Sequence, residues 1–255
     1  MLALTFLFIK QNIFKFKQGA NPTINKNLNI KMKIINNKYI YYKNNFCRNY
    51  RTSAKAHLEV NPQLEEIIVG SMLGDLSAER RNLNSNTRLQ IKQSNKNREY
   101  VYHLYSLFEE FCGSKPLVMS NFDSRPNKMK EYTAIKFQTL SLPCFNKYRE
   151  MFYANNGVKI IPQNLESLLT TRGLAYWIMD DGYKSNKGFY ICTESFSLGE
   201  HEVLINILRN KFELECSYHK TTNGPRLYIF SSSRDKLLEL IKPYLLTHFF
   251  YKFKD

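Results

Sequence analysis

The feature that most constrains this chain is an internal repeat of secondary-structure patterns. Residues 61–157 predict, in order, a helix, a strand with a second strand or a long turn, a helix, two strands and a helix. Residues 170–245 predict the same order of elements. Two copies of one pattern, each about 100 residues long, indicate a duplicated structural unit. We therefore expect an α+β fold of two pseudo-symmetric αββαββα halves.

The predicted elements of each half are assigned from periodicity and from capping residues. In the first half we expect helices at 61–75, 97–113 and 143–157, and strands at 87–93, 117–122 and 132–140. In the second half we expect helices at 170–182, 197–213 and 233–245, and strands at 187–195, 215–220 and 226–230. The first helix has the clearest start, because Asn61 is an N-cap residue and Pro62 occupies the first helical position.

The charge of the chain is concentrated at its N-terminus. Residues 1–58 contain eleven Lys or Arg and no Asp or Glu, whereas the remaining residues contain 26 basic groups against 22 acids. We expect residues 1–58 to be a basic extension that is disordered or a mitochondrial presequence. The alternative is upstream sequence of an AT-rich genome read in frame. The predicted halves are then residues 59–160 and 161–255, in a protein of the mitochondrion.

Cysteine and histidine spacing excludes two classes of protein. The chain has five Cys and five His but no C-x-x-C or H-x-x-x-H pair, so a structural zinc site is not expected. The odd, widely spaced cysteines also argue against a secreted disulfide framework. The apolar residues 1–9 are too few to span a bilayer, and no membrane partner is expected.

The first helix of each half carries a candidate metal site. When residues 68–76, IVGSMLGDL, are aligned with residues 174–182, LAYWIMDDG, Asp75 and Asp181 fall in register. The aligned pairs are Gly70 with Tyr176 and Gly74 with Asp180, so a bulky face is expected to pack against a glycine face. Two carboxylates at neighbouring helix C-termini are unfavourable unless they share a cation. Oxygen ligands of this kind favour Mg²⁺.

These two segments resemble the signatures of the LAGLIDADG homing endonucleases, in the single-chain form with two motifs. The resemblance extends over residues 60–252 and is close in KIIPQNLESLLTTRGLAYWIMDDG, LRNKFELEC and LIKPYLLTHFFYK. It implies motif helices packed at a central interface, saddle-shaped antiparallel sheets that face DNA, and a Mg²⁺ cofactor that Mn²⁺ can replace.

The resemblance also implies roles for individual residues. Asp75 and Asp181, and not Asp180, become the catalytic metal-binding carboxylates. Lys159 and Lys252 become basic residues near the scissile phosphates, where they would stabilise developing negative charge. Without the resemblance, each lysine is better explained as the cap of a helix end.

Gln90 matches a polar position near the metals in the first half. The corresponding place in the second half is expected to hold Cys192, with Glu194 two residues later. This departure leaves a third possibility open, a DNA-binding protein that has lost cleavage.

Strand alternation supplies the candidate DNA contacts. Polar side chains share one strand face at several places, and such faces are ordinarily hydrated. Under the resemblance these strands lie in the major groove and read base edges, while basic turn residues neutralise phosphates. The strand candidates are Arg88, Gln90, Lys92, Lys136, Gln138, Tyr218, Lys220, Arg226 and Tyr228. The turn candidates are Arg80, Arg81, Lys96, Lys128, Lys130, Lys184 and Lys187.

The expected function is site-specific cleavage of double-stranded DNA by a monomer, at a long asymmetric target, in support of intron homing. The alternative is an RNA-binding intron maturase with the same fold, whose partner would be intron RNA. The presence of Asp75, Asp181, Lys159 and Lys252 favours the nuclease, because an RNA-binding cofactor does not need them.

Overall fold

The computed structural model describes residues 31–35, 38–42, 52–123 and 130–253. The chain divides into two compact units, Met1–Arg51 and Thr52–Asp255. In the first unit, β1 (Lys31–Ile35) and β2 (Lys38–Tyr42) pair as antiparallel strands, although the sequence predicted no element there. The other residues of that unit, including most of the predicted extension, lie outside the described ranges.

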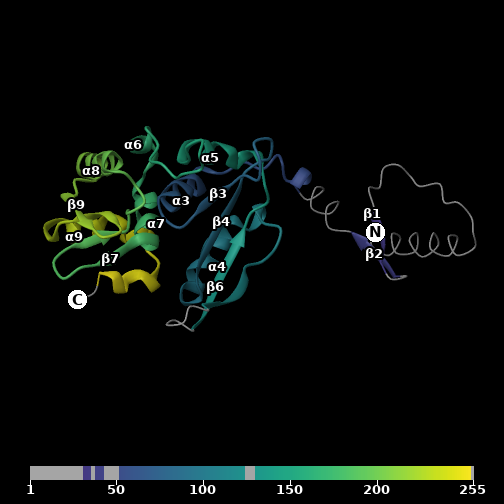
Figure 1. Cartoon of the computed structure of the whole chain (residues 1–255). Helices are drawn as coiled ribbons and strands as arrows, with labels where there is room; N and C mark the ends of the chain where they lie inside the picture. The colour runs from purple at the N-terminus through teal and green to yellow at the C-terminus, as the bar shows by residue number, and fades with distance from the viewer. Residues whose placement is uncertain (1–30, 36–37, 43–51, 124–129, 254–255) are drawn as a thin grey trace, which may run out of the picture. The chain divides into compact units, whose positions relative to one another are not determined.

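The second unit contains the repeated pattern (Figure 1). The first half consists of α3 (Pro62–Leu73), β3 (Ser77–Glu79), β4 (Arg88–Ser94), α4 (Arg98–Phe108), β5 (Leu117–Asp123), β6 (Lys130–Gln138) and α5 (Asn146–Phe152). The second half consists of α7 (Thr171–Asp181), β7 (Gly182–Lys184), β8 (Phe189–Ile191), α8 (Leu198–Phe212), β9 (Cys216–Thr221), β10 (Gly224–Ile229) and α9 (Ser231–Ile241). The short helix α6 (Leu165–Leu168) precedes α7. The αββαββα order is confirmed in both halves.

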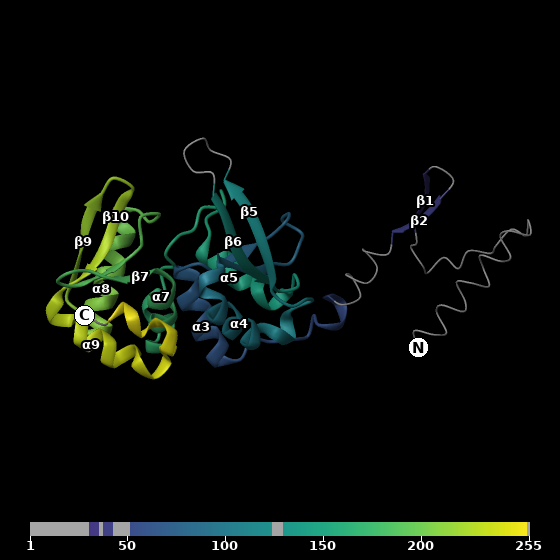
Figure 2. The same ribbon diagram turned by 90° about the horizontal axis from the view of Figure 1, so that it is seen from below.

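Each half builds a four-stranded antiparallel sheet with the same strand order. The sheets run β3-β4-β6-β5 and β7-β8-β10-β9, so the second strand of each half pairs with the fourth. Helix α4 packs on β4 and β6, and α8 packs on β9 and β10. Figure 2 shows the two sheets on either side of a central pair of helices. The predicted α+β class is therefore correct.

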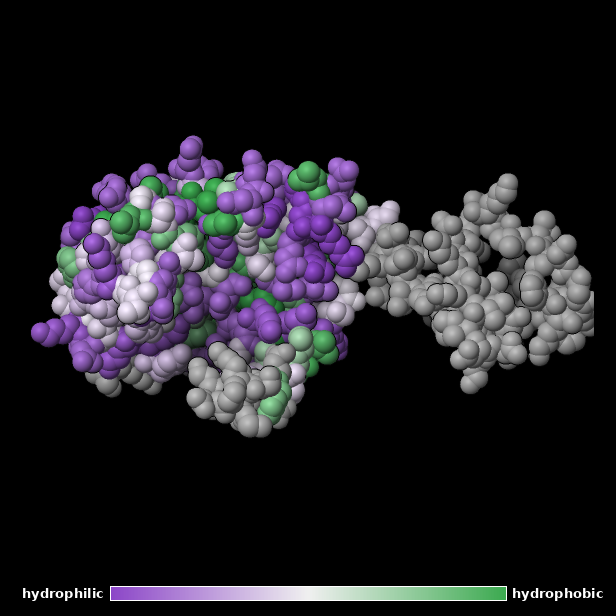
Figure 3. Space-filling view, viewed as in Figure 1, coloured by the Kyte–Doolittle hydropathy of each residue, from purple (hydrophilic) through white to green (hydrophobic). Residues whose placement is uncertain are grey.

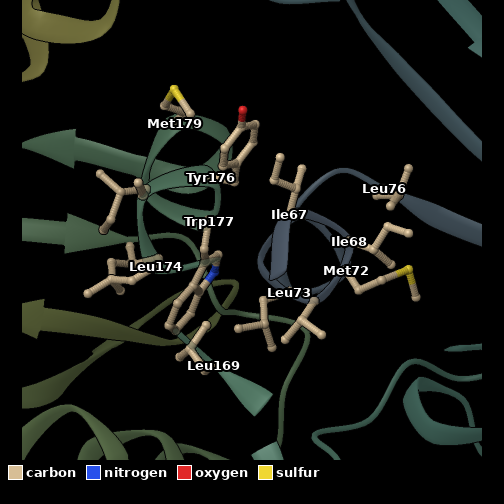
Figure 4. Packing of buried hydrophobic residues seen from close by; sticks show 14 of the residues in the cluster. Ile67, Ile68, Met72, Leu73, Leu76, Leu169, Leu174, Tyr176, Trp177 and Met179 are labelled. Atoms are coloured by element: carbon tan, nitrogen blue, oxygen red, sulfur yellow. The ribbon is translucent and has the colours of Figure 1, made fainter. Parts of the chain in front are cut away.

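The central pair is α3 and α7, which lie side by side (Figure 4). Their apolar residues, among them Ile67, Met72, Leu174 and Trp177, are almost completely buried. Burial of such side chains stabilises the fold by about 1.5–3 kcal/mol each. This packing explains why buried residues run through most of both motif helices.

The closest approach of the two helices differs from the expected one. A Cβ added at Gly70 would lie 1.9 Å from the carbonyl oxygen of Gly173, so glycine meets glycine there. Tyr176, which was expected to pack on this face, instead places its hydroxyl 2.7 Å from Nε2 of His103. The expectation of a bulky face against a glycine face is wrong at Gly70, because the backbones themselves are in contact.

Side-chain caps fix where the motif helices begin. Asn61 Oδ1 accepts a hydrogen bond from the amide of Leu64 at 2.9 Å, as the N-cap position predicts. At the start of α7, Thr170 caps the amide of Gly173 and donates to Glu66 of α3 at 2.8 Å. The Thr170 hydroxyl therefore aligns one motif helix with the other.

The surface hydropathy and the state of the cysteines can be described for the second unit. Figure 3 shows that the viewed face of the second unit is mostly hydrophilic, with small separate hydrophobic patches. In the part of the chain that the structure describes, no helix is long and apolar enough to cross a membrane. The four cysteines in those ranges, Cys112, Cys144, Cys192 and Cys216, are free thiols.

Candidate active site

The two motif acids lie at the adjoining C-terminal ends of α3 and α7. Asp181 is the last residue of α7, and Asp75 follows the C-cap residue of α3. The ends are joined directly, since the backbone amide of Asp75 donates to Oδ2 of Asp180 at 3.2 Å. Gly74 leaves room for this contact, because a Cβ there would lie 2.6 Å from the Asp180 side chain.

Two lysines approach the same helix ends. Lys159 Nζ donates to the carbonyls of Gly74 at 2.8 Å and Leu76 at 3.1 Å, on both sides of Asp75. Lys252 Nζ donates to the carbonyls of Ile178 at 3.0 Å and Met179 at 2.7 Å, in the last turn of α7. Each lysine thus caps a motif helix and also brings its positive charge beside the acids.

The pKa values of the acids reflect crowding and partial burial. Burial raises the pKa of Asp75, against the opposing effect of Lys159 and Lys252. Burial, followed by the charge of Asp75, raises the pKa of Asp181 to about 7. For the bases the direction is opposite: burial lowers the pKa of Lys159, and lowers that of Lys252 to about 8. The raised pKa values of the two acids show that their charged forms are disfavoured, so both carboxylates would gain from a bound divalent cation.

The sequence did not reveal a polar network beneath the acids. Gln93 Nε2 donates to Asp75 Oδ2 at 2.9 Å and to Asp180 Oδ1 at 3.2 Å. Tyr100 donates its hydroxyl to Asp180 Oδ1 at 2.7 Å. Burial, and then the charge of Asp75, raises the pKa of Asp180 well above its usual range. A signal was present, because Gln93 follows Leu89 and Ile91 on the otherwise apolar face of β4.

The role of Gln90 near the metals stays a prediction. Gln90 lies on the opposite face of β4 from Gln93, paired in register with Ser77, and within the described residues no hydrogen bond joins its side chain to Asp75. Ser77 is two residues after Asp75, and Tyr183 is two residues after Asp181. Because Tyr183 pairs with Tyr190, the counterpart of Gln90 is Tyr190 and not Cys192.

The open face of the first sheet is polar and basic, as alternation predicted. Gln90 pairs with Gln138 and Lys92 pairs with Lys136 across β4 and β6. Arg88 lies on the same face, but its guanidinium is paired with Glu79 at 2.6 Å. Among the described residues, neither Lys92 nor Lys136 forms an ion pair, and both lie on the face of the sheet opposite the buried residues.

The open face of the second sheet is aromatic instead. Tyr183, Tyr190, Tyr228 and His219 form a continuous cluster, with ring centroids 5.3 Å apart for Tyr183–Tyr190, 4.8 Å for Tyr190–Tyr228 and 4.5 Å for Tyr228–His219. Arg226 joins this face, where it pairs with Glu194 and with the hydroxyl of Tyr183.

Lys220 does not belong to that face. It alternates with Tyr218 and the buried Cys216, and Tyr218 packs on His201 of α8. Lys220 and Arg226 therefore leave opposite sides of the sheet, and Lys220 shares the side of α8 with Tyr218. A DNA contact from Lys220 stays a prediction.

The predicted turn residues are distributed around the two sheets. The guanidinium of Arg80 forms a salt bridge with the carboxylate of Glu150 at 2.9 Å. The other basic turn residues whose side chains are described are exposed. These exposed residues are Arg81, Lys96, Lys184 and Lys187. Lys128 lies outside the described residues, and Lys130 begins β6 with a side chain that is not described.

The donor set of this site suits a hard divalent cation. Among the described residues, no three His, Cys, Asp or Glu side chains are grouped as a ready-made metal cage. Asp75 and Asp181 instead offer two oxygen ligands at an accessible edge, and Mg²⁺ commonly takes one or two carboxylates together with water and substrate phosphate. These two residues fit the implied metal.

Comparison with known proteins agrees with this architecture. Residues 65–237 match the model of the LAGLIDADG DNA endonuclease family. The chain is 32% identical over 197 residues to the cytochrome b mRNA maturase bI2 of Debaryomyces hansenii, covering 76% of this chain and 74% of that protein. It is 32% identical to the probable intron-encoded endonuclease 1 of Wickerhamomyces canadensis, covering 74% of this chain and 82% of that protein.

A solved structure shares the fold. The homing endonuclease I-WcaI bound to its DNA recognition sequence superposes with a TM-score of 0.74 at 28% identity, covering 84% of this chain and 95% of that one. The repeat, the paired motif helices and these relatives lead to one conclusion: the chain belongs to the LAGLIDADG DNA endonuclease family.

Proposed function

We propose that this protein is a Mg²⁺-dependent homing endonuclease that acts as a monomer and cuts both strands of duplex DNA at a long asymmetric site. Mn²⁺ is expected to replace Mg²⁺. The observation that carries the proposal is the meeting of Asp75 and Asp181 at adjoining helix ends, each helix capped by a lysine. A protein that only binds nucleic acid has no need of this arrangement.

The chain's own residues have distinct parts in the proposed reaction. Asp75 and Asp181 would hold the metal, which when bound supplies Lewis-acid activation of water and of the scissile phosphate. Lys159 and Lys252, fixed by main-chain carbonyls, would stabilise negative charge that develops on the phosphates. The carbonyl contacts hold both ammonium groups in place before substrate arrives, so little reorganisation is needed during cleavage.

DNA would lie along the open faces of both sheets. The basic and amide side chains of the first sheet suit hydrogen bonding to base edges, and the aromatic cluster of the second suits apolar contact with thymine methyl groups. The two faces differ in chemistry, which supports an asymmetric target. The mitochondrion is the proposed location, since the similar maturase is named for cytochrome b mRNA.

A second candidate function is that of an intron maturase. It is favoured by the similarity to the bI2 maturase of Debaryomyces hansenii, a protein named for its action on cytochrome b mRNA. The partner would then be intron RNA.

A cleavage assay separates the two functions. The full chain is incubated with duplex DNA that contains intronless insertion junctions, with Mg²⁺ or with EDTA. We expect linear product with Mg²⁺ only. Absence of both nicking and cleavage at every junction, together with tight binding to the intron RNA, would overturn the nuclease proposal.

Substitution of the motif acids tests the site itself. Asp75→Asn and Asp181→Asn should each abolish double-strand cleavage while DNA binding persists in a gel-shift assay. The control is Asp235→Asn on the exposed side of α9, which should cut like the parent. Loss of cleavage in the control, or full activity in either motif variant, would contradict the assignment.

A further inference from the structure

Within the described ranges, the polar network beneath the motif acids bonds to Asp75 but not to Asp181. It runs from Asn97 through Gln93 to the carboxylates of Asp75 and Asp180, and Tyr100 donates to Asp180 from the other side. We call these four residues, Asn97, Gln93, Tyr100 and Asp180, the brace. In the part of the chain that the structure describes, the Asp181 carboxylate accepts no side-chain hydrogen bond.

The geometry of the brace leaves Gln93 little freedom. Gln93 is 7% exposed and Tyr100 is fully buried, so their polar atoms must be satisfied within the protein. Asn97 donates to Oε1 of Gln93 at 2.7 Å, and this bond turns the Nε2 group toward the acids. The amide thus delivers its two protons to Asp75 and Asp180.

Asp180 completes the connection to Asp75 through the backbone. Its Oδ2 accepts the amide of Asp75, while its Oδ1 accepts from Gln93 and Tyr100. Asp75 is consequently held at both its amide and its carboxylate. Hydrogen bonds of this kind orient a metal-binding carboxylate. Their removal commonly lowers metal affinity or activity by roughly tenfold to a hundredfold.

In the described part of the second half, the corresponding polar residues bond to each other and not to the motif acids. Thr193 lies three residues after Tyr190, as Gln93 lies three residues after Gln90, and its side chain contacts His201 of α8. Thr193 Oγ1 lies 2.8 Å from His201 Nε2, and it also accepts the amide of Leu227 at 3.0 Å. Both side chains are buried, and among the described residues neither forms a hydrogen bond with Asp75, Asp180 or Asp181. The counterpart of Asp180 is Gly74, which has no side chain.

We propose that Asp75 and Asp181 each serve the cut of one DNA strand, and that the brace is a one-sided positioning device that fixes Asp75 and leaves Asp181 unsupported. Cleavage of one strand then depends on Gln93, Tyr100 and Asp180, while cleavage of the other does not. This inference rests on the proposed nuclease function. Gln93 and Tyr100 are positioning residues, because they act through the two carboxylates.

The test compares the two strand cuts within one molecule. Supercoiled plasmid carrying the target is digested with Mg²⁺, and each strand of a matching duplex is end-labelled. Gln93→Met and Tyr100→Phe should slow one strand cut by about tenfold or more, so that nicked circles accumulate and both variants spare the same strand. General destabilisation would instead slow both cuts together, so the ratio of the two rates separates positioning from folding.

Two matched variants act as controls. Tyr148→Phe removes another buried phenol of the first half, whose hydroxyl contacts Glu65 at 3.4 Å, and should leave the strand ratio unchanged. Thr193→Val breaks the counterpart pair in the second half and should not produce the same nicked species. Equal slowing of both strands by Gln93→Met and Tyr100→Phe, or the same nick from Thr193→Val, would overturn the brace. Failure of the parent protein to cut would instead overturn the proposed function, and the brace with it.

Discussion

At the scale of single residues, Lys252 is the most enclosed cation of the site. It is 7% exposed, and its ammonium group bonds two carbonyls in the last turn of α7. Lys252→Met keeps the length of the side chain but leaves those carbonyls without a donor. We expect the free energy of unfolding to fall by about 1–3 kcal/mol, measured by urea denaturation, and cleavage to fall as well.

The control for this prediction is Lys236→Met. Lys236 lies on α9 and pairs with the exposed Glu213, and such surface pairs contribute about 0–1 kcal/mol. Equal destabilisation by Lys236→Met and Lys252→Met would show that the carbonyl contacts of Lys252 have no special weight.

Cys216 offers a test of burial at the same scale. The residue is fully buried, and burial raises the pKa of its thiol to about 11. A raised pKa means that the thiol stays protonated at pH 8, so it should not react with iodoacetamide in the native protein and should react after unfolding in urea. Peptide mass mapping after brief alkylation would measure this. Rapid native labelling of Cys216 would contradict the packing of β9 against α8.

The residues of the site were only partly predictable. Asp75 and Asp181 stood out because the repeat placed them in register, and their lysines followed from the resemblance. Gln93 was missed although it interrupts an apolar strand face, because a single polar residue there does not say which distant group it contacts. The side of the sheet on which Lys220 lies was not predictable either, since alternation gives which residues share a face but not which face is covered.

At the scale of elements, the contact of α3 with α7 depends on glycine. A Cβ at Gly70 would meet the Gly173 carbonyl oxygen at 1.9 Å, so Gly70→Ala forces the two helices apart. We expect a loss of several kcal/mol in the free energy of unfolding, because main-chain atoms cannot move aside. Chemical denaturation monitored by Trp177 fluorescence measures this, as Trp177 lies in the same interface.

Gly199→Ala is the matched control for this prediction. Gly199 is in the first turn of α8, and an added Cβ would meet nothing within 4 Å. Replacement of a helical glycine by alanine there should leave stability unchanged or raise it by up to about 1 kcal/mol. If Gly70→Ala were as stable as Gly199→Ala, the close packing of α3 on α7 would be wrong.

The order of elements was predictable, and the shortest elements were not. Strands β3 and β7 have three residues each, too few to show a period of two, and they are defined by pairing with β4 and β8. The predicted strand at 187–195 was too long, because Ser197 starts the capping box of α8 and the chain turns after Ile191 to reach it. Tertiary pairing, rather than local pattern, fixes these boundaries.

At the scale of the whole molecule, the two halves present different chemistry on one scaffold. The first sheet exposes lysine and glutamine, and the second exposes an aromatic cluster with its arginine already paired. If one duplex lies across both halves, exposed lysines in the turns of each half should contact phosphates of the same DNA molecule. Both halves would then displace counterions from the DNA on binding, so the binding constant should fall as the salt concentration rises.

Lys96 of the first half and Lys187 of the second provide the test, because both are exposed turn residues. Lys96→Ala and Lys187→Ala should each reduce the slope of log K against log salt by about 1, and the double variant by about 2. Filter binding of target duplex between low and moderate salt measures the slopes, with Lys236→Ala on α9 as a control that should not change them. A slope that responds to one lysine and not the other would mean that only one half holds the phosphate backbone, because two halves bound to one duplex must both contribute to the release of counterions.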